Sequence, residues 1–241
     1  MSSKKNKKNP GMTREMEMES ARIFGKHVTK EKALLLFVVT MLACAMPMQL
    51  GIRLWDRIPE IVETGLIGMD GKDDSLPRAA VVFLVPGLMC LLNLICHGQL
   101  WFNQKRMTLP NTPVRLVGRW GFPVISVLFC SGLMLESAGG GLTLTFLTPC
   151  VLGLVLLMLG GHVWDCPRDA KIALRFSFTE ENEQAWREVH RFAGWLWSVG
   201  GLLVLEATML TDGANMMVPL LGLALLVVPV IYGYLRGRCS D

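Results

Sequence analysis

Six apolar blocks, each about 20 residues long, constrain this chain more than any other feature. A helix of about 20 residues crosses the roughly 30 Å hydrocarbon core of a bilayer and satisfies its own backbone hydrogen bonds there. A mean hydropathy of +0.41, concentrated in such blocks, is hard to accommodate in a soluble domain. We therefore predict an all-α polytopic membrane protein, a bundle of six transmembrane helices over residues 33–54, 76–102, 116–136, 142–164, 192–210 and 216–235.

The basic residues predict the orientation of this bundle. Of the 24 Lys and Arg, 20 lie in the segments that a six-span chain places on the same side as its termini. The other side receives only Arg53, Arg57, Lys72 and Arg78. Loops rich in Lys and Arg stay in the cytoplasm, so we expect a multi-pass protein of the cell membrane with both termini cytoplasmic. The net charge of +4 is explained by topology, and no nucleic-acid partner is expected.

The same pattern divides the chain into three parts. Residues 1–32 form a basic cytoplasmic tail. Within it, residues 13–27 are compatible with an interfacial helix that lies on the surface of the lipid bilayer. Residues 33–110 form a two-helix membrane domain with an acidic outer loop, which has too few apolar residues for a core of its own. Residues 111–241 form a four-helix membrane domain with a cytoplasmic loop at 165–191.

Sequence motifs of catalysis and metal binding are missing. The chain has no HExxH, no GxSxG, no P-loop and no paired-carboxylate motif. Its seven cysteines include no CxxC pair, so small apolar packing residues are their expected role. We expect neither enzymatic activity nor a metal or cofactor.

Ionisable residues inside the spans are the candidates for function, because charge at bilayer depth is costly. Glu136 ends the third span and Glu206 lies one turn from the outer end of the fifth. The two form either an outward-facing acidic pocket for a cation or a basic peptide, or simply reach headgroups and neighbouring helices. His97 in the second span, four residues from Asn93, is either functional or a packed, hydrogen-bonded side chain.

The stretch from Thr179 to Trp197 passes from a charged helix into an apolar span. Ser177 with Glu180 is the expected helix cap, with Thr179 as the alternative. Further along the helix, Glu183 and Arg187 are spaced to pair across one turn. Trp186, His190 and Gly194 follow at four-residue spacing and share one stripe of the helix. We predict an interfacial helix that continues into the fifth span.

This stretch resembles the C-terminal signature of the SdpI family of bacterial membrane immunity proteins. In that family an arginine segment leads into a W-R-x-x-H-R-x-x-G helix. The matching residues are Arg175, Phe178, Thr179, Trp186, Arg187, His190, Arg191 and Gly194. Residues 33–110 are similar to the domain of unknown function that often precedes this signature, at Pro59, Gly65, Asp70 and Pro86; departures include Ile61 in place of a histidine and Ser177 in place of a proline.

The resemblance implies immunity or resistance to a secreted, membrane-active toxin peptide, together with signalling across the membrane through a cytoplasmic regulator. In this interpretation the outer loop and the outer ends of the third and fifth spans receive the peptide. On the inner side, Arg175 pairs with Asp165 or Glu180 beneath the bundle. The alternatives are a transporter of small solutes or ions, a structural subunit of a membrane complex, and, for the signature itself, plain anchoring.

Overall fold

The fold is a bundle of long helices, which the apolar blocks of the sequence require. The computed structural model describes residues 28–67, 73–105, 112–164, 166, 168, 173–176, 179, 182–211 and 217–238. The predicted interfacial helix at 13–27 lies outside the described residues.

The helices follow the predicted spans closely. In chain order they are α2 (Lys30–Arg53), η1 (Ala80–Leu84) continuing into α3 (Val85–Lys105), α4 (Thr112–Ile125) continuing through η2 (Ser126–Cys130) into α5 (Ser131–Ser137), α6 (Leu144–Val163), α8 (Glu183–Thr211) and α9 (Met217–Arg238). Here η denotes a π-helical turn. Among the described residues, five helices are long and apolar enough to cross a membrane: 30–53, 80–103, 114–137, 144–163 and 183–211. The sixth predicted span corresponds to α9, whose apolar stretch Leu220–Arg236 is shorter.

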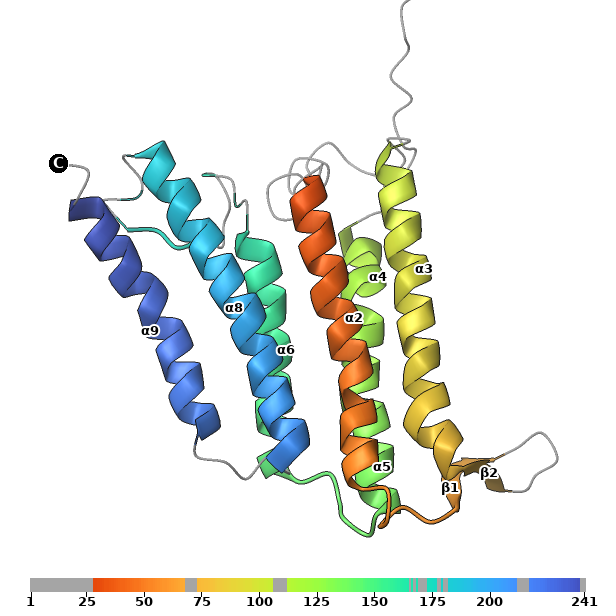
Figure 1. The fold of residues 1–241 in the computed structure, drawn as a ribbon. Coiled ribbons are helices and arrows are strands. Elements are labelled where there is room, and N and C mark those ends of the chain that lie inside the picture. The colour runs from red at the N-terminus through yellow and green to blue at the C-terminus, as the bar shows by residue number, and fades with distance from the viewer. Residues whose placement is uncertain are drawn as a thin grey trace, which may run out of the picture.

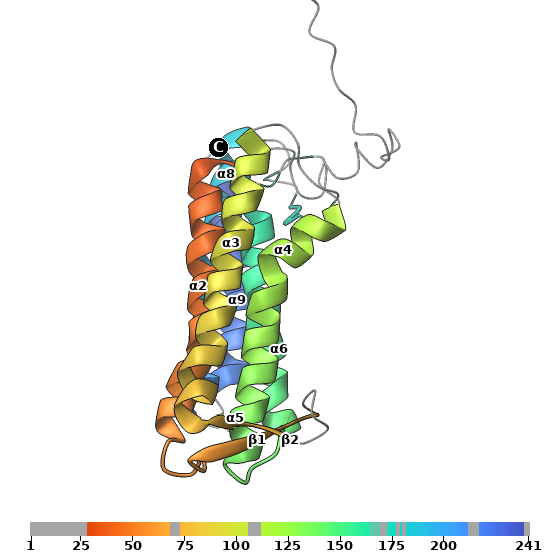
Figure 2. The same ribbon diagram turned by 90° about the vertical axis from the view of Figure 1, so that its right-hand side faces the viewer.

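The helices run side by side with their ends at two levels (Figure 1). The upper end of Figure 1 holds the starts of α2 and α8 and the ends of α3 and α9. The lower end holds a β-hairpin and the C-terminal end of α8. In Figure 2 the first part of α4 bends away from the other helices at the upper end. Helix α8 packs on both α6 and α2, and so joins α6 and α9 to the N-terminal helices. The predicted domain boundary at residue 110 stays a prediction.

The segment between α2 and η1 contains a β-hairpin, which the sequence did not predict and which adds to the mostly helical fold. Strands β1 (Ile61–Ile67) and β2 (Asp73–Pro77) form an antiparallel hairpin in which Val62 faces Leu76, with an irregularity between Glu63 and Ile67. Val62 and the preceding Ile58 are each 1% exposed and belong to the core of the helices. The hairpin therefore has no core of its own, as expected, because it packs on that of the bundle.

Helices α6 and α8 approach each other most closely at four glycines. A β-carbon added at Gly201 would lie 2.7 Å from the carbonyl oxygen of Gly153 and 2.9 Å from the Leu157 nitrogen. One added at Gly160 would lie 2.7 Å from the Ser198 nitrogen and 2.8 Å from the Gly194 oxygen. Backbone atoms cannot move aside as flexible side chains do. We call Gly153, Gly160, Gly194 and Gly201 the glycine seam, and only glycine fits this crossing of two apolar helices.

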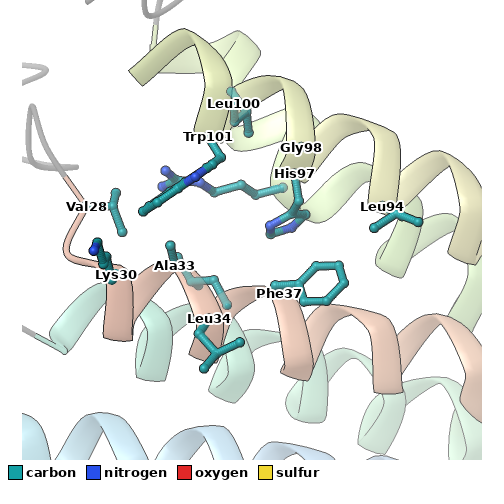
Figure 3. A pocket seen from close by; sticks show the side chains of 12 residues that line it. Val28, Lys30, Ala33, Leu34, Phe37, Leu94, His97, Gly98, Leu100 and Trp101 are labelled. Atoms are coloured by element: carbon teal, nitrogen blue, oxygen red, sulfur yellow. The ribbon is translucent and has the colours of Figure 1, made fainter. Parts of the chain in front are cut away.

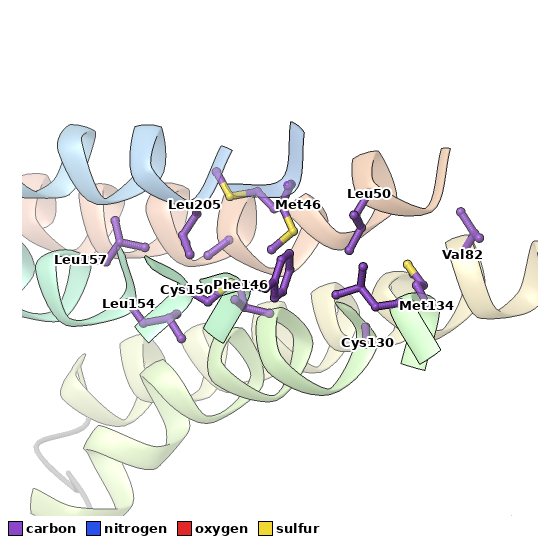
Figure 4. Close-up of a cluster of buried hydrophobic side chains, with 14 of the residues drawn as sticks. Met46, Leu50, Val82, Cys130, Met134, Phe146, Cys150, Leu154, Leu157 and Leu205 are labelled. Carbon is purple, nitrogen blue, oxygen red and sulfur yellow. The ribbon is translucent and has the colours of Figure 1, made fainter. Parts of the chain in front are cut away.

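Around the seam, buried apolar side chains from α2, η1, η2, α5, α6 and α8 form one continuous cluster (Figure 4). Phe146, Met134 and Leu205 are each at most 1% exposed. A second cluster joins α6, α8 and α9, with Trp197, Val204 and Leu225 among its members. Many other large apolar residues, such as Leu34 and Leu203, lie exposed on the outside of the helices, as in proteins that face lipid.

The proline inside α9 is compensated by a side chain of a neighbouring helix. Pro229 of α9 has no N–H, so the carbonyl of Leu225, four residues earlier, lacks its helical donor. The indole Nε1 of Trp197 donates to that carbonyl at 2.8 Å. This bond satisfies a backbone group that the proline freed. Separately, the Ser126 hydroxyl donates to the Cys44 carbonyl of α2 at 2.7 Å.

The glycine seam predicts an asymmetry between two Gly→Ala substitutions. At Gly201 the added methyl group collides with backbone, and overpacking of this kind costs about 1–3 kcal/mol. At Gly98 of α3 nothing lies within 4 Å of an added β-carbon, so Gly98→Ala should be neutral or stabilising by about 0.5–1 kcal/mol. Thermal unfolding of the detergent-purified variants measures both. Equal melting temperatures of Gly201→Ala and Gly98→Ala would contradict the close backbone contact at the glycine seam.

Candidate functional site at the start of α8

The signature helix begins later in the chain than the sequence predicted. Helix α8 starts at Glu183, and Asn182 caps it: the side-chain oxygen of Asn182 accepts from the backbone nitrogens of Gln184 at 2.9 Å and Ala185 at 3.2 Å. The expected cap residues Ser177 and Glu180 lie outside the described residues. The hydroxyl of Thr179 accepts from the Phe176 nitrogen and donates to the Phe176 carbonyl. It does not cap α8, because its bonds stay within the preceding segment.

Trp186 and His190 form a buried, stacked pair on the first turns of α8. Their rings lie 4.0 Å apart at an angle of 28°, and the two residues are 3% and 1% exposed. The spacing of four residues places one ring above the other on the same helix face. The predicted stripe is therefore confirmed, and it points into the protein.

Each ring of the pair reaches back to the segment that links α6 to α8. The Trp186 Nε1 donates to the Cys166 carbonyl at 2.8 Å. The backbone nitrogen of Leu174 donates to the Nε2 of His190 at 3.1 Å. We call Trp186 and His190, with these two backbone groups, the clasp. The clasp satisfies polar backbone groups of an irregular segment, which would otherwise cost about 1–3 kcal/mol each when buried.

The two hydrogen bonds of His190 define its protonation. Its Nδ1 lies 2.8 Å from the Trp186 carbonyl, which only accepts, so Nδ1 carries a proton. Its Nε2 faces the Leu174 N–H, which only donates, so Nε2 carries none. The clasp thus requires a neutral imidazole of one tautomer. No nitrogen of this ring remains for proton transfer or for a metal, which supports a structural role.

The arginines of the signature lie around the clasp at the surface. Arg187 pairs with Glu183 at 3.2 Å, as predicted from their spacing. Arg191 pairs at 2.8 Å with Glu31 of α2 and lies 5.8 Å above the Trp164 ring. Exposed pairs of this kind contribute only about 0–1 kcal/mol each. The Arg191 pair nevertheless links α8 to α2 across the upper end.

Two other signature residues, Arg175 and Gly194, lie in different surroundings. Arg175 is exposed, and its guanidinium lies 3.5 Å from the Arg168 carbonyl. Its expected partners Asp165 and Glu180, and the signature residue Phe178, lie outside the described residues. Gly194, in contrast, has a clear role. A β-carbon there would lie 3.0 Å from the nitrogen of Trp164 and from the Gly160 oxygen. The final glycine of the signature is therefore part of the glycine seam.

Several residues of this site were not predicted from the sequence. Lys32 of α2 donates through Nζ to the carbonyls of Trp164 at 2.5 Å and His162 at 3.3 Å, at the end of α6. A lysine is favourable at a helix C-terminus, where carbonyls lack helical partners. Glu188 binds Arg236 of α9 at 2.5 Å. The sequence contains no local signal for either contact, because the partners lie 132 and 48 residues apart.

The two carboxylates of the predicted outer acidic pocket have different surroundings. Glu136 lines a cavity of about 600 Å³ between α5 and β1, together with Glu63. Glu206 does not line this cavity. With the Gln49 amide nitrogen facing it, Glu206 accepts hydrogen bonds at 2.6 and 2.9 Å from this α2 side chain. The interpretation of Glu206 as a group hydrogen-bonded between helices fits this geometry better than a shared pocket.

The clasp predicts that Trp186→Phe lowers stability although the aromatic stack remains. The substitution removes the indole N–H and leaves the buried Cys166 carbonyl without this donor, so we expect a loss of about 1–3 kcal/mol. Trp195→Phe is the matched control, because Trp195 lies on the same helix and is 56% exposed. Thermal unfolding in detergent compares the two. A control that loses as much as Trp186→Phe would refute the clasp.

Comparison with known proteins identifies this segment. Residues 165–233, which hold the clasp, all of α8 and most of α9, match the model of the SdpI/YfhL protein family. No curated protein and no solved structure matches the chain. The similarity of residues 33–110 to the domain that often precedes the signature stays a prediction. The SdpI resemblance of the signature is confirmed as a match over residues 165–233, and this match together with the long apolar helices indicates a membrane protein.

Proposed function

We propose that this protein resides in the cell membrane and confers immunity to a secreted, membrane-active toxin peptide. The observation that carries the proposal is the SdpI/YfhL match over residues 165–233, joined to a signature whose Trp and His are both engaged in buried contacts. These contacts support a structural role for the signature in the proposed function.

The proposed topology has both termini in the cytoplasm. Its support is that the start of α2, the start of α8 and the end of α9 share the upper end of the bundle (Figure 1). The basic residues Lys30, Lys32, Arg187, Arg191 and Arg236 belong to these helix ends. Positive charge near helix ends favours the cytoplasmic side, so we assign the upper end to the cytoplasm and the hairpin to the outside.

On the outer side, the proposed contact surface for the toxin is the cavity between β1 and α5. Glu63 and Glu136 line it, both exposed, and apolar Ile61 and Leu133 lie beside them. An acidic and apolar surface is complementary to a cationic amphipathic peptide. In this proposal, the clasp and the glycine seam keep α6 and α8 rigid, so that the surface is held in place.

A survival assay tests the role of the clasp. Cells sensitive to a killing peptide from the protein's own source community express the protein, and survival is compared with that of cells carrying an empty vector. We expect His190→Ala to lose most of the protection at equal membrane levels, because the Leu174 N–H loses its acceptor. His190→Gln is the matched variant: its amide oxygen can accept from Leu174, so partial protection should return. Equal protection by His190→Ala and wild type would contradict this role and leave the signature as an anchor.

Arg175→Ala belongs in the same assay, because the signature includes an exposed arginine whose role in immunity or signalling is part of the proposal. A loss of protection without a loss of thermal stability would indicate contact with a cytoplasmic regulator. Loss of both would indicate a packing role.

The two outer glutamates give a second, independent prediction. Glu136→Gln removes one negative charge from the proposed contact surface. We expect the dose of peptide that the cells tolerate to fall by about two- to tenfold, because an exposed or partly shielded charge pair contributes this much to binding. Glu206→Gln is the matched comparison, because Glu206 does not line that cavity. The proposal fails if Glu206→Gln abolishes protection while Glu136→Gln retains it. That result, with solute flux into liposomes sensitive to Glu206→Gln, would favour the transporter alternative.

A further inference from the structure

A second cavity lies at the upper end of the bundle, between α2 and α3, and the proposed immunity function does not use it. Its volume is about 380 Å³. Figure 3 shows Lys30, Ala33, Leu34 and Phe37 on one wall, facing His97 and Trp101 of α3 on the other. Arg119 of α4 also lines it. Most of the wall is therefore apolar, with cationic groups at one end.

The cations of this cavity have no carboxylate beside them among the described residues. No Asp or Glu is among the described residues that line it. Within the part of the chain that the structure describes, neither Lys30 nor Arg119 has a carboxylate within salt-bridge distance. The electrostatic neighbour of Arg119 is another guanidinium, that of Arg115. A guanidinium such as that of Arg119, held between apolar helices, favours binding of an anion.

The positions of these cations match the headgroup region of a membrane. Lys30 is the first residue of α2, whereas Arg119 lies seven residues after the start of α4, or about 10 Å along a helix at 1.5 Å per residue. Arg119 also lines a smaller cavity, of about 220 Å³, on the α6 side of α2. Its side chain thus lies between helices rather than in the surrounding water.

The side of the cavity that faces away from the bundle is open to lipid. Leu34 is 63% exposed and Leu94 is 46% exposed, although both line the cavity. A hydrocarbon chain that enters between α2 and α3 would therefore contact apolar side chains along its length. A small hydrophilic anion would leave most of this apolar wall uncovered, because it cannot make favourable contacts with hydrocarbon side chains.

The back of the cavity is rigid. The His97 Nε2 lies 3.2 Å from the Thr40 hydroxyl, which also accepts from the Asn93 amide at 3.1 Å. The His97 ring packs edge-on against Phe37 at 5.8 Å. These contacts join α2 to α3 behind the cavity and fix the position of the His97 ring.

We propose that this cavity binds the anionic headgroup of a phospholipid, with the phosphate between Arg119 and Lys30 and an acyl chain along Leu34 and Leu94. The planar guanidinium of Arg119 suits bidentate contact with phosphate oxygens. Basic pockets between transmembrane helices commonly bind the headgroups of anionic lipids. The cavity is too small for a whole lipid, so the remaining chain lies in the bilayer.

Native mass spectrometry of the full-length protein in detergent tests the proposal. Phosphatidylglycerol and phosphatidylcholine with identical acyl chains are the probes. We expect the anionic lipid to bind at least about tenfold more tightly, and Arg119→Gln to remove about tenfold of its affinity, as for the loss of one charge-assisted hydrogen bond. Arg187→Gln is the matched control, because it removes the same charge from an exposed arginine at the same end of the bundle.

A second pair of variants tests the apolar wall without a change of charge. Leu34→Trp narrows the cavity and should weaken lipid binding several-fold. Leu42→Trp, on the same helix at 48% exposed but not lining the cavity, should not. If Arg119→Gln does not fold, this pair of variants still tests whether the lipid binds in the cavity between α2 and α3. Equal binding of the two lipids, equal losses in Arg119→Gln and Arg187→Gln, or displacement of the lipid by millimolar inorganic phosphate would each overturn the proposal.

Discussion

The close contact of α6 with α8 is the interaction on which the rest of the structure depends. Two helices surrounded by lipid gain little from the hydrophobic effect, because the lipid is as apolar as their side chains. They gain instead from direct packing, which grows as the backbones approach. The four glycines of the seam allow this approach at Gly153 against Gly201 and at Gly160 against Gly194. Helix α8 then presents its other faces to α2 and α9, and so connects the whole bundle.

The clasp is a consequence of the same contact. Because α6 and α8 are packed so tightly, the segment between them must turn over the upper end of the pair. Its backbone groups at Cys166 and Leu174 face the interior, where water does not compensate them. Trp186 and His190 supply the one donor and the one acceptor that these groups need. The signature residues therefore stabilise one helix pair. The rings of Trp186 and His190 bind the segment between α6 and α8, and Gly194 allows the close contact of the two helices.

Several polar groups elsewhere in the bundle find their partner on a neighbouring helix. Trp197 satisfies a carbonyl freed by Pro229, Ser126 binds a carbonyl of α2, and Gln49 binds Glu206. Arg119 differs from these, because the described residues give it no carboxylate and it faces a cavity open to lipid. This contrast between satisfied and unbalanced polar groups separates structural residues from candidate ligand-binding ones.

The sequence by itself determined the class of the protein, the helical spans and the signature stripe, because these depend on local periodicity and on the thickness of a bilayer. It also determined the Glu183–Arg187 pair, which needs only the geometry of one helix. Only the tertiary structure decided that Asn182 caps α8, that the outer loop is a hairpin packed on the core, and that Glu136 lines a cavity beside β1 that Glu206 does not line. The same holds for Lys32 at the end of α6, for Arg191 with Glu31, and for the cavity between α2 and α3. These features join residues far apart in the chain, and their geometry exists only after the helices have packed.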